Sequence, residues 1–167
     1  MCLGGSTIRG ENQKPYNGAL DYDYIMWIDS DIIFTPNDLM KLIKHNKDIV
    51  SGLYMMDDMK HFATVEQMDD NFFIKNGYYK FLSYEDIKNK KELFSVDYTG
   101  FGWILIKFGV FEKLKYPWFK PLFKDFNNGI VEFTMEDVSL CRLLVEIGYK
   151  IWIDPTVLVG HEKKIVL

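Results

Sequence analysis

One stretch of the sequence, YIMWIDSDIIFTPNDL, constrains the fold more than any other. An apolar run rich in β-forming residues leads into two aspartates, Asp29 and Asp31, and then into the start of a helix. Thr35 suits the helix N-cap, Pro36 the first helical position and Asp38 the third. The pattern predicts a buried strand, a polar turn and a helix in direct succession.

The next apolar run, DIVSGLY at residues 48–54, has the pattern of another buried strand. Strand, helix and strand together form a βαβ unit, in which the two strands should be parallel neighbours joined by a right-handed crossover. Asp29 and Asp31 would then lie at the C-terminal end of a central strand. A chain of 167 residues is long enough to bury a core, so we expect one domain over residues 1–167.

The middle of the chain is less regular. Asn76-Gly77 stands between aromatic-rich runs, which predicts a hairpin with a type I′ turn. Residues 83–93 are typical of a short exposed helix. Residues 93–98 and 102–107 are typical of two paired strands separated by a glycine-containing bend.

The last third returns to an alternation of helix and strand. Apolar residues keep helical spacing through residues 138–147, and Gly148 suits the position that ends a helix. Cys141 falls on the apolar face, where we expect a buried free thiol. A strand over residues 149–153 follows, and we expect Asp154 and the proline after it to stop that strand.

Composition excludes several classes of protein. The formal net charge of −4 argues against a surface built for nucleic acid. No apolar run approaches the roughly 18–20 residues that span a bilayer, and the N-terminus lacks the apolar core of a signal peptide. We therefore expect a cytoplasmic protein without a transmembrane segment.

The two aspartates carry the first chemical signal. Side chains alternate along a strand, so Asp29 and Asp31 point to the same side if the strand continues. Their mutual repulsion is relieved by a divalent cation such as Mn²⁺ or Mg²⁺, which can in turn hold a diphosphate. The alternative is a plain polar turn before the Thr35 cap, because turns favour aspartate and serine.

Two later features have similar alternatives. Asp137 follows Thr134 by three residues, as in a capping box, and Glu136 and Asp137 both suit the first turn of a helix. A carboxylate there can also act as a general base on a hydroxyl. His161 is either a structural histidine or a ligand of a divalent metal.

Three segments in fixed order resemble the glycosyltransferases of the GT-A fold, in the broad family-two-like group. They are DYDYIMWIDSDIIFTPNDLMKLI, YTGFGWILIKFGVFEKL and FTMEDVSLCRLLVEIGYKIWIDPTVLVGH. The chain is also similar to fungal mannosyltransferases of the mannan-polymerase type. The resemblance spans Asp21 to His161 and implies an α/β, Rossmann-like mixed sheet flanked by helices.

The resemblance also implies roles for residues at the metal and the donor. In the D-x-D motif, Asp31 would bind the metal directly, and Asp29 would contact the ribose or the water shell of the metal. His161 would complete the metal coordination. Gly102 and Trp103 match the loop and strand start that support the donor sugar and acceptor.

The implied reaction transfers a sugar from a nucleotide-diphosphate donor to a hydroxyl of a saccharide, lipid or protein acceptor. Asp137, or with less support Glu136, matches the base of inverting members. The usual opening strand, which grips the nucleotide base, is missing or reduced before Asp21, and Arg9 is a candidate contact for the diphosphate. Donor, acceptor, stereochemistry and oligomeric state stay open.

Two other interpretations compete with this one. The run from Met26 to Thr35 also resembles the first motif of haloacid-dehalogenase phosphatases, in which Asp29 would be the nucleophile and Asp31 an acid and base. That chemistry needs a late Gly-Asp pair, which the sequence lacks. A non-catalytic sugar-binding remnant is the other alternative, and metal-dependent binding of nucleoside diphosphates would separate it from a transferase.

Overall fold

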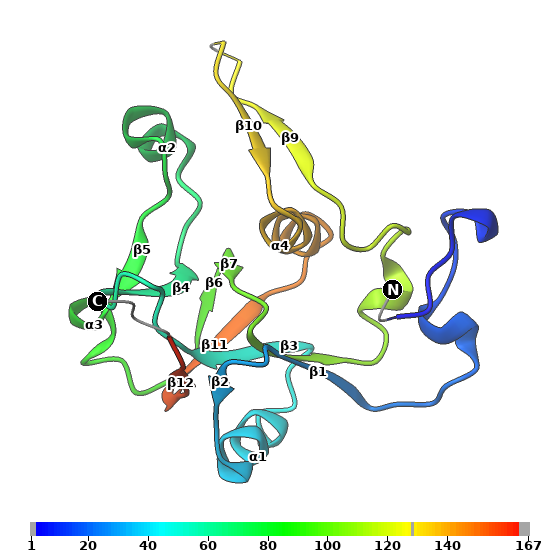
Figure 1. The fold of residues 1–167 in the computed structure, drawn as a ribbon, viewed down its shortest axis with the longest axis horizontal. Helices are drawn as coiled ribbons and strands as arrows, with labels where there is room; N and C mark the ends of the chain where they lie inside the picture. The colour runs from blue at the N-terminus through cyan, green and yellow to red at the C-terminus, as the bar shows by residue number, and fades with distance from the viewer. Residues whose placement is uncertain (1–2, 128, 164–167) are drawn as a thin grey trace.

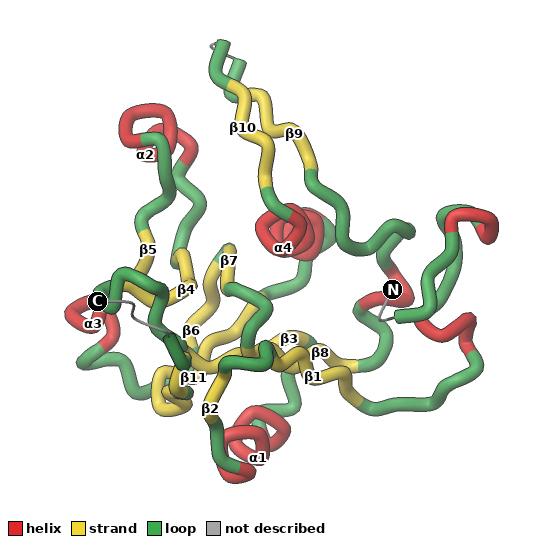
Figure 2. The backbone as a smooth tube through the Cα atoms, viewed as in Figure 1, coloured by secondary structure: helices red, strands yellow, loops and turns green. Residues whose placement is uncertain are grey.

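The computed structural model describes residues 3–127 and 129–163. Its helices are η1 (Thr7–Arg9), η2 (Pro15–Gly18), α1 (Pro36–Lys44), α2 (Asp70–Asn76), α3 (Tyr84–Ile87), η3 (Phe111–Lys113) and α4 (Glu136–Glu146), where η denotes a 3-10 helix. Its strands are β1 (Tyr24–Ile28), β2 (Ile32–Ile33), β3 (Ile49–Leu53), β4 (His61–Val65), β5 (Phe81–Ser83), β6 (Phe94–Val96), β7 (Tyr98–Thr99), β8 (Trp103–Lys107), β9 (Leu122–Asp125), β10 (Val131–Thr134), β11 (Ile151–Leu158) and β12 (Gly160–His161). Figure 2 shows short helices set among strands and long loops.

A five-stranded mixed sheet of order β1-β8-β3-β11-β6 forms the centre of the fold. In Figure 1, α4 lies above this sheet and α1 below it, while the β9–β10 ribbon projects beyond α4. A three-stranded sheet, β5-β4-β7, and a small pair, β12-β2, complete the described strands. The fold is therefore mixed α/β, as predicted, and it has few helices.

The βαβ prediction is correct in direction and wrong in pairing. β8 lies between β1 and β3 and pairs antiparallel with both, so β1 and β3 run parallel without touching. Four of the five residues of β8 are buried, which is typical of a central strand that is covered on both faces. β1 is consequently an edge strand in the described part of the chain, not the central strand that we expected.

The segment before β1 carries no regular strand among its described residues. It contains η1 and η2 and reaches the sheet only at β1. No helix in the described ranges combines the length and hydropathy needed to cross a bilayer.

Strand alternation divides the core between the two faces of the sheet. Ile104 and Ile106 belong to the cluster that includes Leu140 of α4. Trp103 and Leu105 belong to the cluster that includes Leu42 of α1. Because side chains alternate along a strand, α4 and α1 cover opposite faces of the sheet. Cys141 is a buried free thiol, as predicted, and burial raises its pKa to about 12.

The two longer helices begin where the sequence predicts, although only one uses the predicted cap. Thr35 and Asp38 form the capping box of α1, with the Thr35 N–H donating to the Asp38 carboxylate at 2.9 Å. At α4 the N-cap is Met135, and the Thr134 hydroxyl hydrogen-bonds Ser139 at 2.6 Å instead. The predicted capping box between Thr134 and Asp137 is therefore wrong.

The predicted hairpin at Asn76-Gly77 is also wrong, because these residues end helix α2. The Asp69 side chain caps the start of α2 by accepting the N–H groups of Asn71 and Phe72. Gly77 closes the helix in the left-handed conformation, with φ of 78°. The same Asn-Gly pair can serve a hairpin or a helix end, and the cap at Asp69 favours the helix.

The strands that follow do not pair with each other. β6 pairs with β11, β7 with β4, and β8 with β1 and β3. The predicted pairing of residues 93–98 with residues 102–107 is therefore wrong. The helix expected over residues 83–93 is limited to α3, which ends at Ile87.

Asp154 does not stop β11, which continues to Leu158. The strand shifts register against β3 between Ile153 and Leu158. Asp154 is only 5% exposed, yet its carboxylate accepts the N–H and hydroxyl of Thr156 and lies 2.7 Å from His45 Nε2. Because these partners satisfy the hydrogen-bonding needs of the buried carboxylate, the strand can continue beyond Asp154.

Gly52 allows this irregular strand to approach β3 closely. A Cβ added at Gly52 would lie 2.5 Å from the Val157 carbonyl oxygen and 2.6 Å from its Cγ1. We expect Gly52→Ala to lower the free energy of unfolding by ~2–3 kcal/mol, because backbone atoms of two paired strands would have to separate. Urea unfolding measures this change.

Gly160→Ala is the matched control, because the nearest atom to an added Cβ there is the Ile33 Cβ at 3.1 Å. We expect a smaller loss of stability for this variant. Equal urea midpoints for Gly52→Ala and the unmodified chain would show that β11 does not approach β3 closely at Gly52.

Candidate metal and donor site

Asp31 and His161 meet although they lie far apart in the sequence. β2 and β12 pair antiparallel, which sets His161 opposite Ile32, and the Glu162 N–H donates to the Asp31 carbonyl at 2.7 Å. His161 Nε2 lies 3.1 Å from Asp31 Oδ2. The predicted proximity of these two side chains is confirmed, while their role as metal ligands stays a prediction.

The His161 ring is held in one orientation by its other nitrogen. Nδ1 lies 2.6 Å from the Met55 carbonyl oxygen, which can only accept, so Nδ1 carries the proton. Nε2 is then the ring nitrogen that faces the Asp31 carboxylate, 3.1 Å from its Oδ2. The Tyr54 ring packs edge-on against the imidazole, with centroids 5.3 Å apart. This arrangement is typical of a histidine that is oriented for metal binding.

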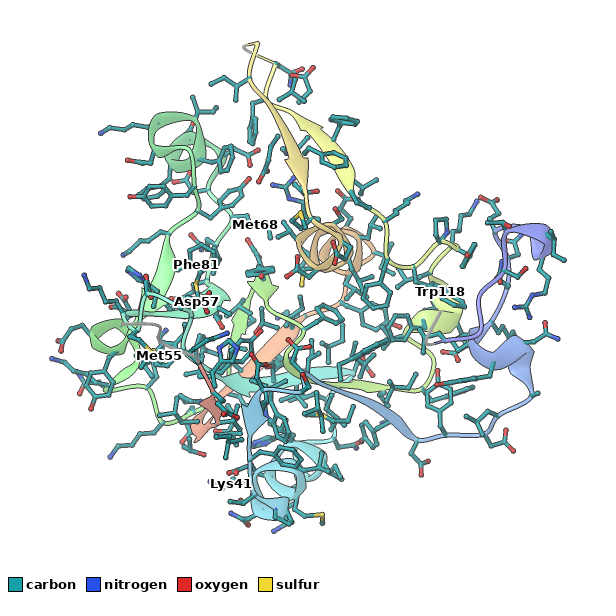
Figure 3. All side chains as sticks on the ribbon, viewed as in Figure 1. Lys41, Met55, Asp57, Met68, Phe81 and Trp118 are labelled. Atoms are coloured by element: carbon teal, nitrogen blue, oxygen red, sulfur yellow. The ribbon has the colours of Figure 1, made fainter. Side chains whose placement is uncertain are left out.

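A lysine completes the charged group. Lys163 Nζ lies 3.3 Å from Asp31 Oδ2 and 2.9 Å from Asp57 Oδ1. Figure 3 shows Asp57 and Met55 near each other at the left of the view. Desolvation raises the pKa of Asp31, but the hydrogen bond from Lys163 and the charge of His161 outweigh it, so the pKa lies below its ordinary value.

These residues fit a divalent cation only with help from a substrate. Within residues 3–127 and 129–163, no three His, Cys, Asp or Glu side chains gather as a metal site. Mg²⁺ in particular retains waters and is often bound by one or two carboxylates plus substrate phosphates. Asp31 and His161 therefore suit a cation whose remaining ligands are diphosphate oxygens and water.

Asp29 lies in a different setting from Asp31. β1 ends at Ile28, and the Ile32 N–H donates to the Asp29 carbonyl across a turn, so strand alternation does not continue through the motif. The Asp29 carboxylate faces Gly102, where an added Cβ would lie 3.0 Å from its Oδ2. Strand alternation would place both aspartates on one side only if the strand continued, and that condition is not met because β1 ends at Ile28.

Tyr54 is a site residue that the sequence analysis missed. Its hydroxyl accepts the Gly102 N–H at 3.1 Å. Burial chiefly, and then the charges of Asp29 and Asp137, raise the pKa of Tyr54 to about 12, against the lowering effect of the Gly102 hydrogen bond. Tyr54 follows the buried strand β3 directly, and this position at a strand end was the available signal.

Asp137 is oriented by two hydrogen bonds at the start of α4. Its Oδ2 accepts the Tyr98 hydroxyl at 2.8 Å, and its Oδ1 accepts the Val138 N–H at 2.7 Å. Burial, followed by the charge of Asp137, raises the pKa of Tyr98, which therefore stays a donor. Glu136, the preceding residue, lines a cavity of about 350 Å³.

The structure does not bring the side chains of Arg9 and Trp103, which were predicted to lie at the donor, to the pair of Asp31 and His161. Arg9 donates to the Gly4 carbonyl within the N-terminal segment, which Figure 1 shows in dark blue at the far right, away from β2 and β12. Trp103 is fully buried, with its ring 4.6 Å from that of Phe34. The Trp103 side chain therefore lies in the core, and the support of the donor by the strand start at Gly102 and Trp103 stays a prediction.

Comparison with known proteins supports the fold and goes no further. No protein-family model matches the sequence, and no curated protein matches it significantly. Among solved structures, the chain is similar to the crystal structure of A197 from STIV, with a TM-score of 0.53 and 18% sequence identity. The match covers 86% of this chain and 60% of A197. The shared feature is thus the mixed α/β fold.

Proposed function

We propose that this protein is a metal-dependent glycosyltransferase that moves a sugar from a nucleotide-diphosphate donor to a hydroxyl acceptor. The observation that carries the proposal is the pairing of Asp31 Oδ2 with His161 Nε2 at 3.1 Å, with the histidine anchored through Nδ1. Two protein ligands at the rim of an α/β sheet suit Mn²⁺ or Mg²⁺ carrying a diphosphate.

The metal site and its lysine act on the leaving group. A bound cation would offset the negative charge that develops on the departing diphosphate. Asp31 and His161 hold that position from one side. The Lys163 ammonium lies 3.3 Å from Asp31 Oδ2 and can turn to a phosphate oxygen when the carboxylate is engaged elsewhere.

Asp137 acts on the acceptor. The Tyr98 hydroxyl and the Val138 N–H fix its carboxylate, and this orientation favours proton transfer from a hydroxyl placed beside it. The acceptor oxygen forms a bond to the anomeric carbon as its proton passes to Asp137. The bond from that carbon to the diphosphate oxygen breaks, and its electron pair leaves with the diphosphate.

The phosphatase alternative has less support. It would require further carboxylates near Asp29 and Asp31 to hold Mg²⁺, and the described residues contain no such group of three. The GT-A interpretation needs only two protein ligands, because the donor supplies the others.

A thermal-unfolding screen of nucleotide sugars tests the proposed function. We expect at least one nucleoside-diphosphate sugar to raise the unfolding temperature with Mn²⁺ present, by an amount equivalent to ~2.7 kcal/mol at 100 times its Kd. EDTA should abolish the shift, and the matching nucleoside monophosphate should have little effect. Donor binding that ignores the metal, or no binding by any donor, would contradict the proposal.

A further inference from the structure

The ribbon formed by β9 and β10 has one face that is anchored to the rest of the protein. Lys124 Nζ lies 3.0 Å from Asp70 Oδ2 at the start of α2. Arg142 Nη2 of α4 lies 3.1 Å from Glu132 Oε2. Lys124 and Glu132 are cross-strand partners, so they stand on the same face of the ribbon. The two ion pairs therefore hold this face against α2 and α4.

The opposite face of the ribbon is apolar and exposed. Phe123 and Phe133 are cross-strand partners with ring centroids 4.9 Å apart, and they are 76% and 57% exposed. Val131 and Met135 lie two residues on either side of Phe133, so alternation puts them on the same face, where they are 56% and 61% exposed. We call these four residues the ribbon patch. Figure 1 shows the ribbon projecting beyond α4, which leaves the patch accessible to another molecule.

The ribbon patch has the area of a small protein interface. A fully exposed phenylalanine side chain presents on the order of 200 Å². The exposed fractions of the four residues therefore leave roughly 400–500 Å² of surface on each copy, an area typical of functional patches. Two copies packed face to face would bury roughly 1,000 Å² together with the residues around the patch, which is near the lower limit of specific interfaces. The area suits a reversible dimer with a Kd on the order of micromolar.

Charges beside the patch are complementary across a two-fold axis. Asp125 follows Phe123 by two residues toward the end of the ribbon, and Lys120 precedes Phe123 by three residues at its base. Both side chains are exposed, and neither forms an ion pair within the described part of the chain. A two-fold axis through the phenylalanine pair sets two ribbons antiparallel. Asp125 of each copy then approaches the partner's Lys120, which favours this arrangement over a parallel one.

A lipid surface fits the ribbon patch less well than a second copy. Asp125 is the cross-strand partner of Val131 and stands on the same face of the ribbon. Glu136 and Asp137 follow directly after Met135. Bringing these carboxylates into an apolar layer is costly, and the formal net charge of −4 opposes binding to anionic lipids.

We propose that two copies of this chain associate through the ribbon patch in a two-fold symmetric dimer. The phenylalanine pairs of the two copies pack against each other at the centre, and an ion pair between Asp125 and the partner's Lys120 lies at each end. Two-fold dimers are the commonest form of homo-oligomer, because one surface then serves both partners. The inference goes beyond the proposed transfer reaction, since the dimer needs neither donor nor metal.

Sedimentation equilibrium over roughly 1–200 μM, a range around the expected Kd, tests the dimer directly. We expect a reversible equilibrium between monomer and dimer. Phe123→Ser should raise the Kd ~100-fold, because it removes an aromatic side chain from the centre of the interface. Tyr84→Ser is the matched control, because Tyr84 on α3 is a 59% exposed aromatic residue outside the patch, and we expect its Kd to be unchanged. Thermal unfolding would verify that both variants fold.

Charge reversal tests the orientation of the two copies. Lys120→Glu and Asp125→Lys should each raise the Kd roughly tenfold, because each substitution places like charges at both ends of the interface. The double variant should recover most of the lost affinity, because the two charges have exchanged places. If the double variant loses as much affinity as the two single variants combined, the antiparallel two-fold arrangement is wrong.

Two further results would overturn the inference: the unmodified chain stays monomeric over the whole concentration range, or Phe123→Ser and Tyr84→Ser have the same Kd. A monomer that binds phosphatidylcholine vesicles, and loses this binding in Phe123→Ser, would assign the patch to a lipid surface instead. None of these measurements involves donor or Mn²⁺. Failure of the dimer therefore leaves the proposed function standing, and failure of donor binding leaves the dimer standing.

Discussion

Replacing Asp137 by asparagine is expected to slow sugar transfer by roughly 10²–10⁴-fold while leaving the fold and donor binding nearly unchanged. The Tyr98 hydroxyl and the Val138 N–H now donate to different oxygens of the carboxylate, at 2.8 and 2.7 Å. In asparagine the amide oxygen can still accept the Val138 N–H, and the amide NH2 can donate to the Tyr98 oxygen, which can also accept. An amide cannot take a proton from an acceptor hydroxyl. The variant therefore removes the proposed base and keeps the same two partners, with the hydrogen bond to Tyr98 reversed.

Single-turnover transfer rates, thermal unfolding and Mn²⁺-dependent donor binding should be measured on the same preparation. Glu146→Gln serves as the control for lost negative charge on α4. A purely structural role for Asp137 predicts an unchanged rate, because asparagine meets the same hydrogen-bonding needs. An unmodified rate in Asp137→Asn would turn attention to Glu136 or to a retaining mechanism without such a base.

The second large effect is expected at Asp31. Asp31→Asn should weaken Mn²⁺-dependent donor binding on the order of 100-fold or more, because a neutral amide is a poor substitute for a carboxylate ligand. The side chain keeps its shape, and an oxygen remains near His161 and Lys163. Titration calorimetry with the donor, in Mn²⁺ and in EDTA, would measure the loss.

Asp57→Asn is the matched control for charge. Asp57 pairs with the same lysine, at 2.9 Å, but its side chain is 84% exposed and makes no contact with His161 in the described part of the chain. We expect donor affinity to change little in this variant. If both variants lose affinity equally, the effect comes from charge near Lys163, and if neither does, the metal assignment of Asp31 is wrong.

Local patterns were sufficient for the helices with strong start signals. Thr35, Pro36 and Asp38 predict the first turn of α1, and the structure shows the same capping box. The helical spacing after Asp137 likewise predicts α4, with Gly148 beyond its end in the left-handed region. Such signals involve residues within one or two turns of each other, so the chain needs no distant partner to produce them.

Local patterns failed where one short sequence suits two structures. Asn76-Gly77 fits a hairpin turn, but the Asp69 cap and the intervening spacing make it the end of α2. Asp154 and the proline after it suggest a strand end, but Thr156 and His45 satisfy the buried carboxylate. In each case the deciding contact lies outside the two residues that were taken as the signal.

For the candidate site, too, the sequence indicated some features and the tertiary structure decided others. The types and positions of Asp29, Asp31, Asp137 and His161 were recognisable from the residues alone, because carboxylates and imidazole near strand ends and at a helix start suggest metal and acid–base chemistry. By itself, the sequence determined the α/β class, the two longer helices and these candidate residues.

Only the tertiary structure decided which of them meet. β8 inserts between β1 and β3, β2 pairs with β12 to bring Asp31 to His161, and Trp103 turns into the core. The tertiary structure also packs the Tyr54 ring against the imidazole of His161. These outcomes depend on pairings between segments up to 130 residues apart, whose stability comes from the packing of whole strands and is not encoded in any short pattern.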